Sequence, residues 1–85
     1  MKKIEIIPIA KRKAYSREIK EDWIIETILD PQQTVEGYNN RKVAQRIYHI
    51  KNKKYLLRVV YEELEGTIFV LTSYLTSKIS RYWEE

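Results

Sequence analysis

The spacing of the apolar residues changes near the middle of the chain. An apolar stripe with the three-to-four-residue spacing of one helix face runs through residues 18–29. Its members are Ile19, Trp23, Ile24, Ile28 and Leu29. From residue 42 onward the apolar residues alternate with polar ones or run together, as they do in strands. The pattern therefore predicts a helical first half and a strand-rich second half.

Two helices are predicted in the first half. Pro8 suits the first turn of a helix, where its missing N–H needs no partner, so a helix is expected over residues 8–16. The second helix covers residues 18–29, and Asp30-Pro31 ends it because the residue before a proline resists helical geometry. Residues 3–7, ahead of the first helix, form a short edge strand or an extended lead-in.

Three strands are predicted in the second half, over residues 42–50, 55–63 and 67–75. A polar loop at residues 51–54 joins the first pair, and a turn at Glu65-Gly66 joins the second. A further extended segment is expected at residues 33–37. The last two strands are apolar on both faces, which is typical of central strands. The predicted fold class is α+β, with two N-terminal helices packed on one face of a mostly antiparallel sheet of three to five strands.

Size and composition narrow the range of functions. Eighty-five residues make a single domain, residues 1–85, and a hydrophobic content of 44% excludes a disordered chain. No apolar run approaches the roughly 20 residues that span a membrane, and Glu5 interrupts the N-terminal apolar stretch that a signal peptide would need. We therefore expect a cytoplasmic protein without a membrane partner. With no cysteine and one histidine, no metal site and no cofactor are expected.

The charges alternate in blocks along the chain. Residues 1–20 hold seven Lys or Arg against two Glu, and residues 37–61 hold seven Lys or Arg and no acid. Residues 21–36 hold five acids and no base, and residues 62–85 hold five Glu against Lys78 and Arg81. Basic blocks that converge in space would form a face that attracts phosphate. The alternative is a solvated surface of mixed sign, which is usual for small domains.

The element order and several motifs resemble the RelE/ParE toxin superfamily. The similarity extends over nearly the whole chain and is closest to a small family of uncharacterised domains grouped with RelE, ParE and BrnT toxins. Its most specific parts are Leu57-Arg58-Val59-Val60 and Thr76-Ser77-Lys78, followed by Arg81-Tyr82-Trp83. One position departs from the pattern, because Ile9 stands where relatives often carry a histidine at the start of the first helix.

The resemblance implies a RelE/ParE-like toxin of a type II toxin–antitoxin system, acting as a metal-independent endoribonuclease that inhibits translation. The substrate would be RNA, including ribosome-bound mRNA, and the partner an acidic antitoxin protein; without it the toxin would be a monomer or a weak dimer. In such enzymes the RNA's own 2′-OH attacks the adjacent phosphodiester. The protein removes a proton, stabilises the charge on phosphorus and protonates the leaving oxygen.

Four residues are the candidates for this chemistry: Arg58, Lys78, Arg81 and Tyr82. Arg58 lies inside an apolar strand, where a charge is costly unless it has a partner, and its fork of donors suits a phosphate. The alternative is a structural ion pair with Glu36 or Glu62, or an arginine whose charged end reaches solvent. In a helical tail, Lys78, Arg81 and Tyr82 would share one side. Tyr82 would then transfer a proton or simply pack against its neighbours.

A second group of residues is predicted to bind the RNA phosphates: Arg12, Lys13, Arg46, His49 and Ser77. Cations near a helix start oppose the helix dipole, so Arg12 and Lys13 would benefit from an anionic ligand. His49 is either a displaced catalytic base or an exposed residue at a loop end. A four-residue loop at 51–54 pairs Arg46 with Val59, whereas a loop one residue longer or shorter pairs it with Arg58, so the register decides whether the two arginines share a face.

A different class of function stays open at this point. The chain could be a non-catalytic interaction module of RelE/ParE fold, either a degenerate toxin or a ParE-like gyrase binder. Ile9 favours this alternative, because it removes an obvious proton carrier. Arg58 and the cations of the tail favour the toxin, and Trp83 is expected to anchor that tail to the core.

Overall fold

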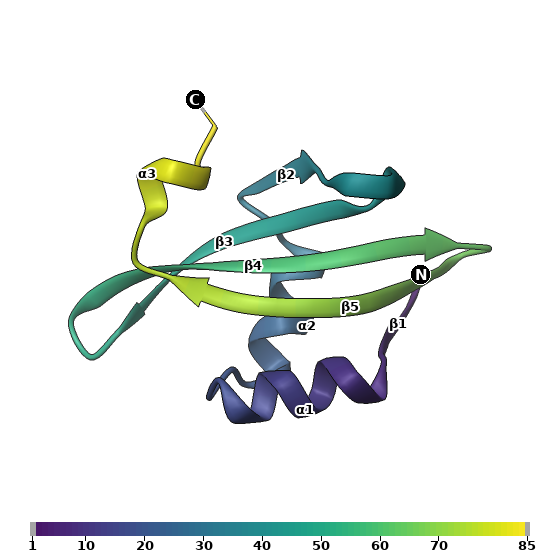
Figure 1. Cartoon of the computed structure of the whole chain (residues 1–85), viewed down its shortest axis with the longest axis horizontal. Helices are drawn as coiled ribbons and strands as arrows, with labels where there is room; N and C mark the ends of the chain where they lie inside the picture. The colour runs from purple at the N-terminus through teal and green to yellow at the C-terminus, as the bar shows by residue number, and fades with distance from the viewer. Residues whose placement is uncertain (1, 85) are drawn as a thin grey trace.

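A five-stranded sheet with strand order β1-β5-β4-β3-β2 forms the centre of the molecule. The computed structural model describes residues 2–84, and Figure 1 shows the elements in place. The strands are β1 (Lys3–Ile6), β2 (Gln33–Glu36), β3 (Lys42–Ile50), β4 (Lys53–Leu64) and β5 (Thr67–Thr76). The helices are α1 (Pro8–Ser16), α2 (Glu21–Leu29) and α3 (Ile79–Tyr82), with a 3-10 turn, η1, at Tyr38–Asn40.

The α+β class is confirmed, and the sheet is mixed. Strands β2 to β5 form an antiparallel meander, whereas β1 lies parallel to β5, with Lys3 opposite Thr67 and Ile6 opposite Val70. Of the two alternatives for residues 3–7, the short edge strand is therefore the one that is present. Its parallel partner, β5, is the strand most distant from it in sequence. The helices α1 and α2 lie between β1 and the antiparallel meander along the chain.

The β3–β4 hairpin closes through two residues rather than the expected four. Lys51 and Asn52 both have positive φ, at 50° and 66°, the backbone that matches the twist of a two-residue hairpin. Lys53 and Lys54 consequently belong to β4, opposite Ile50 and His49. This register places Arg46 opposite Leu57 and Gln45 opposite Arg58. Arg46 and Arg58 therefore point to opposite faces of the sheet.

The second helix begins three residues later than the sequence pattern indicated. Glu18 has φ of 57°, a left-handed conformation that helical residues do not adopt, and the Ile19 N–H donates to the Ala14 carbonyl at 2.9 Å. Residues 17–20 therefore form the link between α1 and α2. Ile19 is nevertheless buried, with 4% of its surface exposed, because the link turns it into the core.

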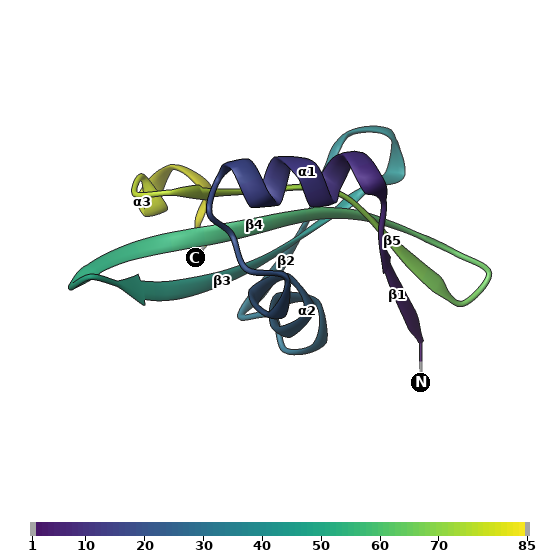
Figure 2. The ribbon, with the colours of Figure 1, turned by 90° about the horizontal axis from the view of Figure 1, so that it is seen from below.

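The main core lies between the sheet and the first two helices. Ala10 and Ala14 of α1 and Ile24 of α2 pack in one cluster with Leu57, Val59 and other buried residues. The two helices contact different strands: α1 runs along β5, and α2 contacts β3 and β4. Figure 2 shows α1 lengthwise and α2 nearly end-on, so the helices cross at a steep angle.

Candidate phosphate-binding site

Arg58 lies on the face of the sheet that points away from the helical core. Its neighbours Leu57 and Val59 belong to the core cluster, and successive side chains of a strand alternate between faces. The register places Gln45 of β3 and Tyr74 of β5 directly opposite Arg58. The Tyr82 carbonyl accepts a hydrogen bond from Gln45, and the Tyr82 ring lies against Arg58, so the C-terminal tail follows the face that carries Arg58.

Neutral groups hold the Arg58 guanidinium. Its Nε–H donates to Gln45 Oε1 at 2.6 Å, and its Nη1 donates to the Tyr74 hydroxyl. The guanidinium carbon lies 4.2 Å from the centre of the Tyr82 ring and 5.5 Å from that of Tyr74, within the range of cation–π attraction. Arg58 is half-buried as a result.

No acidic side chain pairs with Arg58 within residues 2–84. Of the carboxylates considered as partners, Glu62 contacts Arg41 at 3.2 Å, and Glu36 forms no salt bridge in the described chain. The structural ion pair that was an alternative role for Arg58 is therefore not formed. Two aromatic rings stabilise the positive charge of Arg58 by cation–π attraction, but no negative charge neutralises it within residues 2–84.

The C-terminal tail is fixed over Arg58 by hydrogen bonds to two glutamines. Gln45 Nε2 donates to the Tyr82 carbonyl at 3.3 Å. The Gln33 amide makes two bonds to the backbone of Glu84, accepting from its N–H at 3.0 Å and donating to its carbonyl. These contacts place the Tyr82 ring against both Arg58 and Tyr74, whose ring it meets edge-on at 6.3 Å.

The remaining cations of the tail are exposed. Ser77 and Lys78 precede α3, and Arg81 is within it. At the hairpin end, Lys54 lies opposite His49 and shares the Arg58 face by alternation along β4. An open hollow of about 350 Å³ separates this hairpin end from the tail, and it is lined by Ile47, Lys54, Ile79, Ser80 and Trp83. Trp83 is half-buried there, as expected of a residue that anchors the tail.

Three predicted RNA contacts lie elsewhere. Arg46 binds the end of α2 from the opposite face, with its Nη1 2.8 Å from the Asp30 carbonyl and 3.3 Å from Asp30 Oδ2, and its Nε 3.7 Å from Glu26. Arg12 and Lys13 are exposed on α1. The structure thus brings Arg58 and Tyr82 together. Ser77, Lys78 and Arg81 are exposed in the same tail, and His49 is exposed at the hairpin end. The structure does not bring Arg12, Lys13 or Arg46 to Arg58.

Two residues of the site were missed by reasoning from the sequence, Gln45 and Tyr74. Both depend on the strand register, because each is defined by lying opposite Arg58. A usable signal for Gln45 was its position in an apolar strand, where it is fully buried with 0% exposure. A buried amide has to be hydrogen-bonded, so it marks a polar partner on the neighbouring strand.

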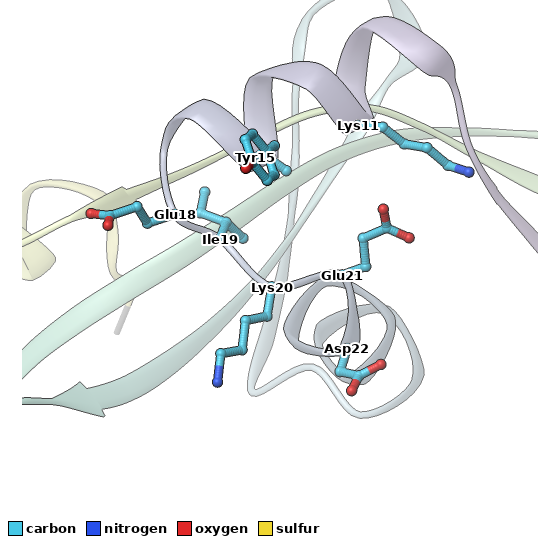
Figure 3. Close-up of a pocket in the computed structure, with 8 residues that line it drawn as sticks. Lys11, Tyr15, Glu18, Ile19, Lys20, Glu21 and Asp22 are labelled. Atoms are coloured by element: carbon cyan, nitrogen blue, oxygen red, sulfur yellow. The ribbon is translucent and has the colours of Figure 1, made fainter.

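A larger hollow of about 730 Å³ lies between α1 and α2, away from Arg58 (Figure 3). Its floor includes Ala14 and Ile19, and its charged rim is mixed, with Lys11 and Lys20 against Glu18, Glu21 and Asp22. Acids outnumber bases on this rim, so its charge does not favour a phosphate. The smaller hollow beside Lys54 shares a face with Arg58 and is the better match for an anionic ligand.

Two tyrosines on the helix side of the sheet have perturbed acidity. Burial raises the pKa of Tyr48, and its 2.5 Å hydrogen bond to Glu26 raises that pKa further. Burial also raises the pKa of Tyr61, together with the negative charge of Glu63. Raised pKa values keep both phenols protonated. Tyr48 lies opposite Tyr55, and Tyr61 lies opposite Lys42. These register positions place both tyrosines on the face that carries Arg46, so they are not part of the Arg58 site.

Within residues 2–84, no three His, Asp or Glu side chains gather in a way that could hold a metal ion. None of the helices described in that range has the length and apolar character needed to cross a membrane. Comparisons with known protein families, curated proteins and solved structures found no match to this chain.

Proposed function

We propose that this protein is the toxin component of a type II toxin–antitoxin system and that it contacts RNA through the sheet face that carries Arg58. The observation that supports the proposal best is a half-buried arginine held only by neutral groups. An arginine has five N–H donors, and Gln45 and Tyr74 use two of them. The remaining donors and the uncancelled charge suit a phosphate oxygen.

A metal-independent cleavage would use the residues around Arg58 in distinct roles. Arg58 would stabilise the negative charge that develops on phosphorus when the 2′-OH attacks. Lys78 and Arg81, which are exposed in the tail, would bind neighbouring phosphates of the strand. The Tyr82 ring packs on Arg58, and the Tyr82 hydroxyl would carry a proton to or from the reacting oxygens. The antitoxin would be an acidic protein that covers this basic face.

A specific observation also favours the second candidate, a non-catalytic interaction module of RelE/ParE-like fold. The ring of Tyr82 lies on the guanidinium at 4.2 Å, where it occupies part of the surface that a phosphate would use. The single histidine, His49, is exposed at the hairpin end, and Ile9 lies on α1, on the other side of the sheet. These features argue against cleavage, because the ring restricts access of a reacting phosphate to Arg58 and no histidine of residues 2–84 lies beside it.

Induced expression in a bacterial host tests the proposal. We expect wild-type protein to arrest growth, and Arg58→Ala, Arg81→Ala and Tyr82→Phe at equal expression to relieve the arrest. Arg12→Ala is the matched control, because it removes an exposed arginine from the helix side. Unimpaired growth with wild-type protein would refute the toxin role. Arrest with intact mRNA in translating ribosomes would refute cleavage and leave the interaction module.

A further inference from the structure

The Gln45 side chain is the buried link between Arg58 and the C-terminal tail. It has no exposed surface, and its amide makes three hydrogen bonds. Oε1 accepts from Arg58 Nε at 2.6 Å. Nε2 donates to Gln33 Oε1 at 3.1 Å and to the Tyr82 carbonyl at 3.3 Å. Because Gln33 in turn bonds the Glu84 backbone, one continuous network runs from the guanidinium to the tail.

The chemistry of these partners fixes the orientation of the Gln45 amide. The Arg58 Nε–H can only donate, so it needs the Gln45 oxygen, and the Tyr82 carbonyl can only accept, so it needs the Gln45 nitrogen. A reversed amide would set donor against donor and acceptor against acceptor, at a buried position where unmade hydrogen bonds are costly. Gln45 therefore dictates the direction of the Arg58 side chain and the position of the Tyr82 backbone together.

We propose that Gln45 is a positioning residue for Arg58, an inference that rests on the proposed RNA contact. It orients the guanidinium with a neutral acceptor, and this leaves the positive charge of Arg58 for a phosphate. A glutamate of the same shape would form an ion pair with Arg58 and would face the Tyr82 carbonyl with a second acceptor. The neutral amide thus sets both the geometry and the net charge of the site.

Two variants and a control test this role. Gln45→Leu removes all three hydrogen bonds at similar volume, and Gln45→Glu keeps the shape but adds a charge. Gln32→Glu is the matched control, because it adds the same charge at an exposed position whose oxygen accepts a hydrogen bond from the Ile47 N–H at 2.8 Å. The probes are the Nε–H resonance of Arg58 in a ¹⁵N-labelled protein, assigned with Arg58→Lys, and binding of a short single-stranded RNA oligonucleotide.

In wild-type protein we expect the Arg58 Nε–H resonance to be resolved and its exchange with solvent to be slow. In Gln45→Leu we expect it to exchange rapidly and to overlap with the signals of solvent-exposed arginines. Gln45→Glu should retain the resonance but weaken RNA binding about tenfold or more, as Arg58→Ala does, and adding Arg58→Ala to it should cause little further loss. Gln32→Glu should change affinity by less than about threefold.

The NMR measurement and the RNA-binding measurement separate the positioning role of Gln45 from the proposed RNA contact. An Arg58 resonance that is unchanged in folded Gln45→Leu, or wild-type affinity in Gln45→Glu, would overturn the positioning role. Where Gln45→Leu fails to fold, the Gln45→Glu comparison alone decides. Wild-type protein that binds no RNA, while its Arg58 resonance still depends on Gln45, would overturn the RNA contact and support the orienting role of Gln45.

Discussion

Leu56 and Leu57 provide the sharpest test of whether the C-terminal tail forms a second buried layer on the sheet. Both side chains have 0% exposure, although they point to opposite faces of β4. Leu57 packs in the cluster beneath α1 and α2. Leu56 lies opposite Ile47, which lines the hollow beside the tail residues Ile79 and Trp83.

The expected magnitudes follow from burial. A buried Leu→Ala change costs about 2–5 kcal/mol, and the cost depends on how far the surroundings collapse. Leu57→Ala should lie near the upper end, because a sheet and two helices enclose it. Leu56→Ala should cost about 2–3 kcal/mol, because the short tail can settle into the space. A domain of this size has about 4–13 kcal/mol of total stability, so either change removes a large share.

Urea denaturation measures this directly. With a slope of about 1 kcal/mol per molar urea, a loss of about 2 kcal/mol lowers the midpoint by about 2 M. Leu64→Ala is the matched control, because Leu64 lies on the same strand with 64% exposure and should cost less than about 0.5 kcal/mol. If Leu56→Ala behaves like Leu64→Ala, the tail does not cover this face, and the enclosed setting of Arg58 is refuted with it.

Three further outcomes are expected. Arg17 Nη1 donates to the Ser73 carbonyl at 2.6 Å, on a part of β5 that does not pair with β1. Arg17→Ala should therefore expose that strand edge and cause concentration-dependent self-association, which sedimentation detects. A strictly monomeric variant would show that Arg17 does not protect the edge. Because the folded-state pKa values of Tyr48 and Tyr61 are raised, their stabilising contribution is complete below about pH 10 and falls as pH rises through the folded values. Alkaline unfolding should therefore be less steep in the Tyr48→Phe and Tyr61→Phe variants, and equal steepness would contradict the assignment. Gly66 has φ of +81° with nothing within 4 Å of an added Cβ, so Gly66→Ala should cost only about 1 kcal/mol of backbone strain in thermal unfolding; a loss of several kcal/mol would show that the turn tolerates no side chain.

The elements with strong local signals were predictable from the sequence. Pro8 marked the start of α1, and the alternation in residues 42–50 gave both ends of β3. The start of α2 was not predictable in this way, because the chain breaks at Glu18 without the glycine or asparagine that usually accompanies a left-handed residue. Likewise Lys53 and Lys54 look like loop residues in sequence, and only the backbone of Lys51 and Asn52 shows that they continue the strand.

The candidate site was predictable only in its charged member. Arg58 was conspicuous as a cation in an apolar strand, and Tyr82 followed from the tail motif. Gln45 could not be identified, because its role depends on the register set by a two-residue turn that lacks glycine. Tyr74 could not be identified either, because a register shift between Val60 and Tyr61 decides which residue of β5 lies opposite Arg58. The grouping of Arg12, Lys13 and Arg46 with this site was not found, since blocks of charge in sequence do not specify which side of a sheet they occupy.

The parallel pairing of β1 with β5 sets the order in which the chain can reach its native state. The partners Lys3 and Thr67 are 64 positions apart, whereas the β3–β4 and β4–β5 hairpins close through two-residue turns. Closing a long loop costs more entropy than closing a short one, and such distant contacts slow folding. The β3–β4–β5 meander should therefore form first, with the strand register around Arg58 already set. The β1–α1 segment would dock onto the finished β5 edge afterwards, as a later and separately exchanging cooperative unit.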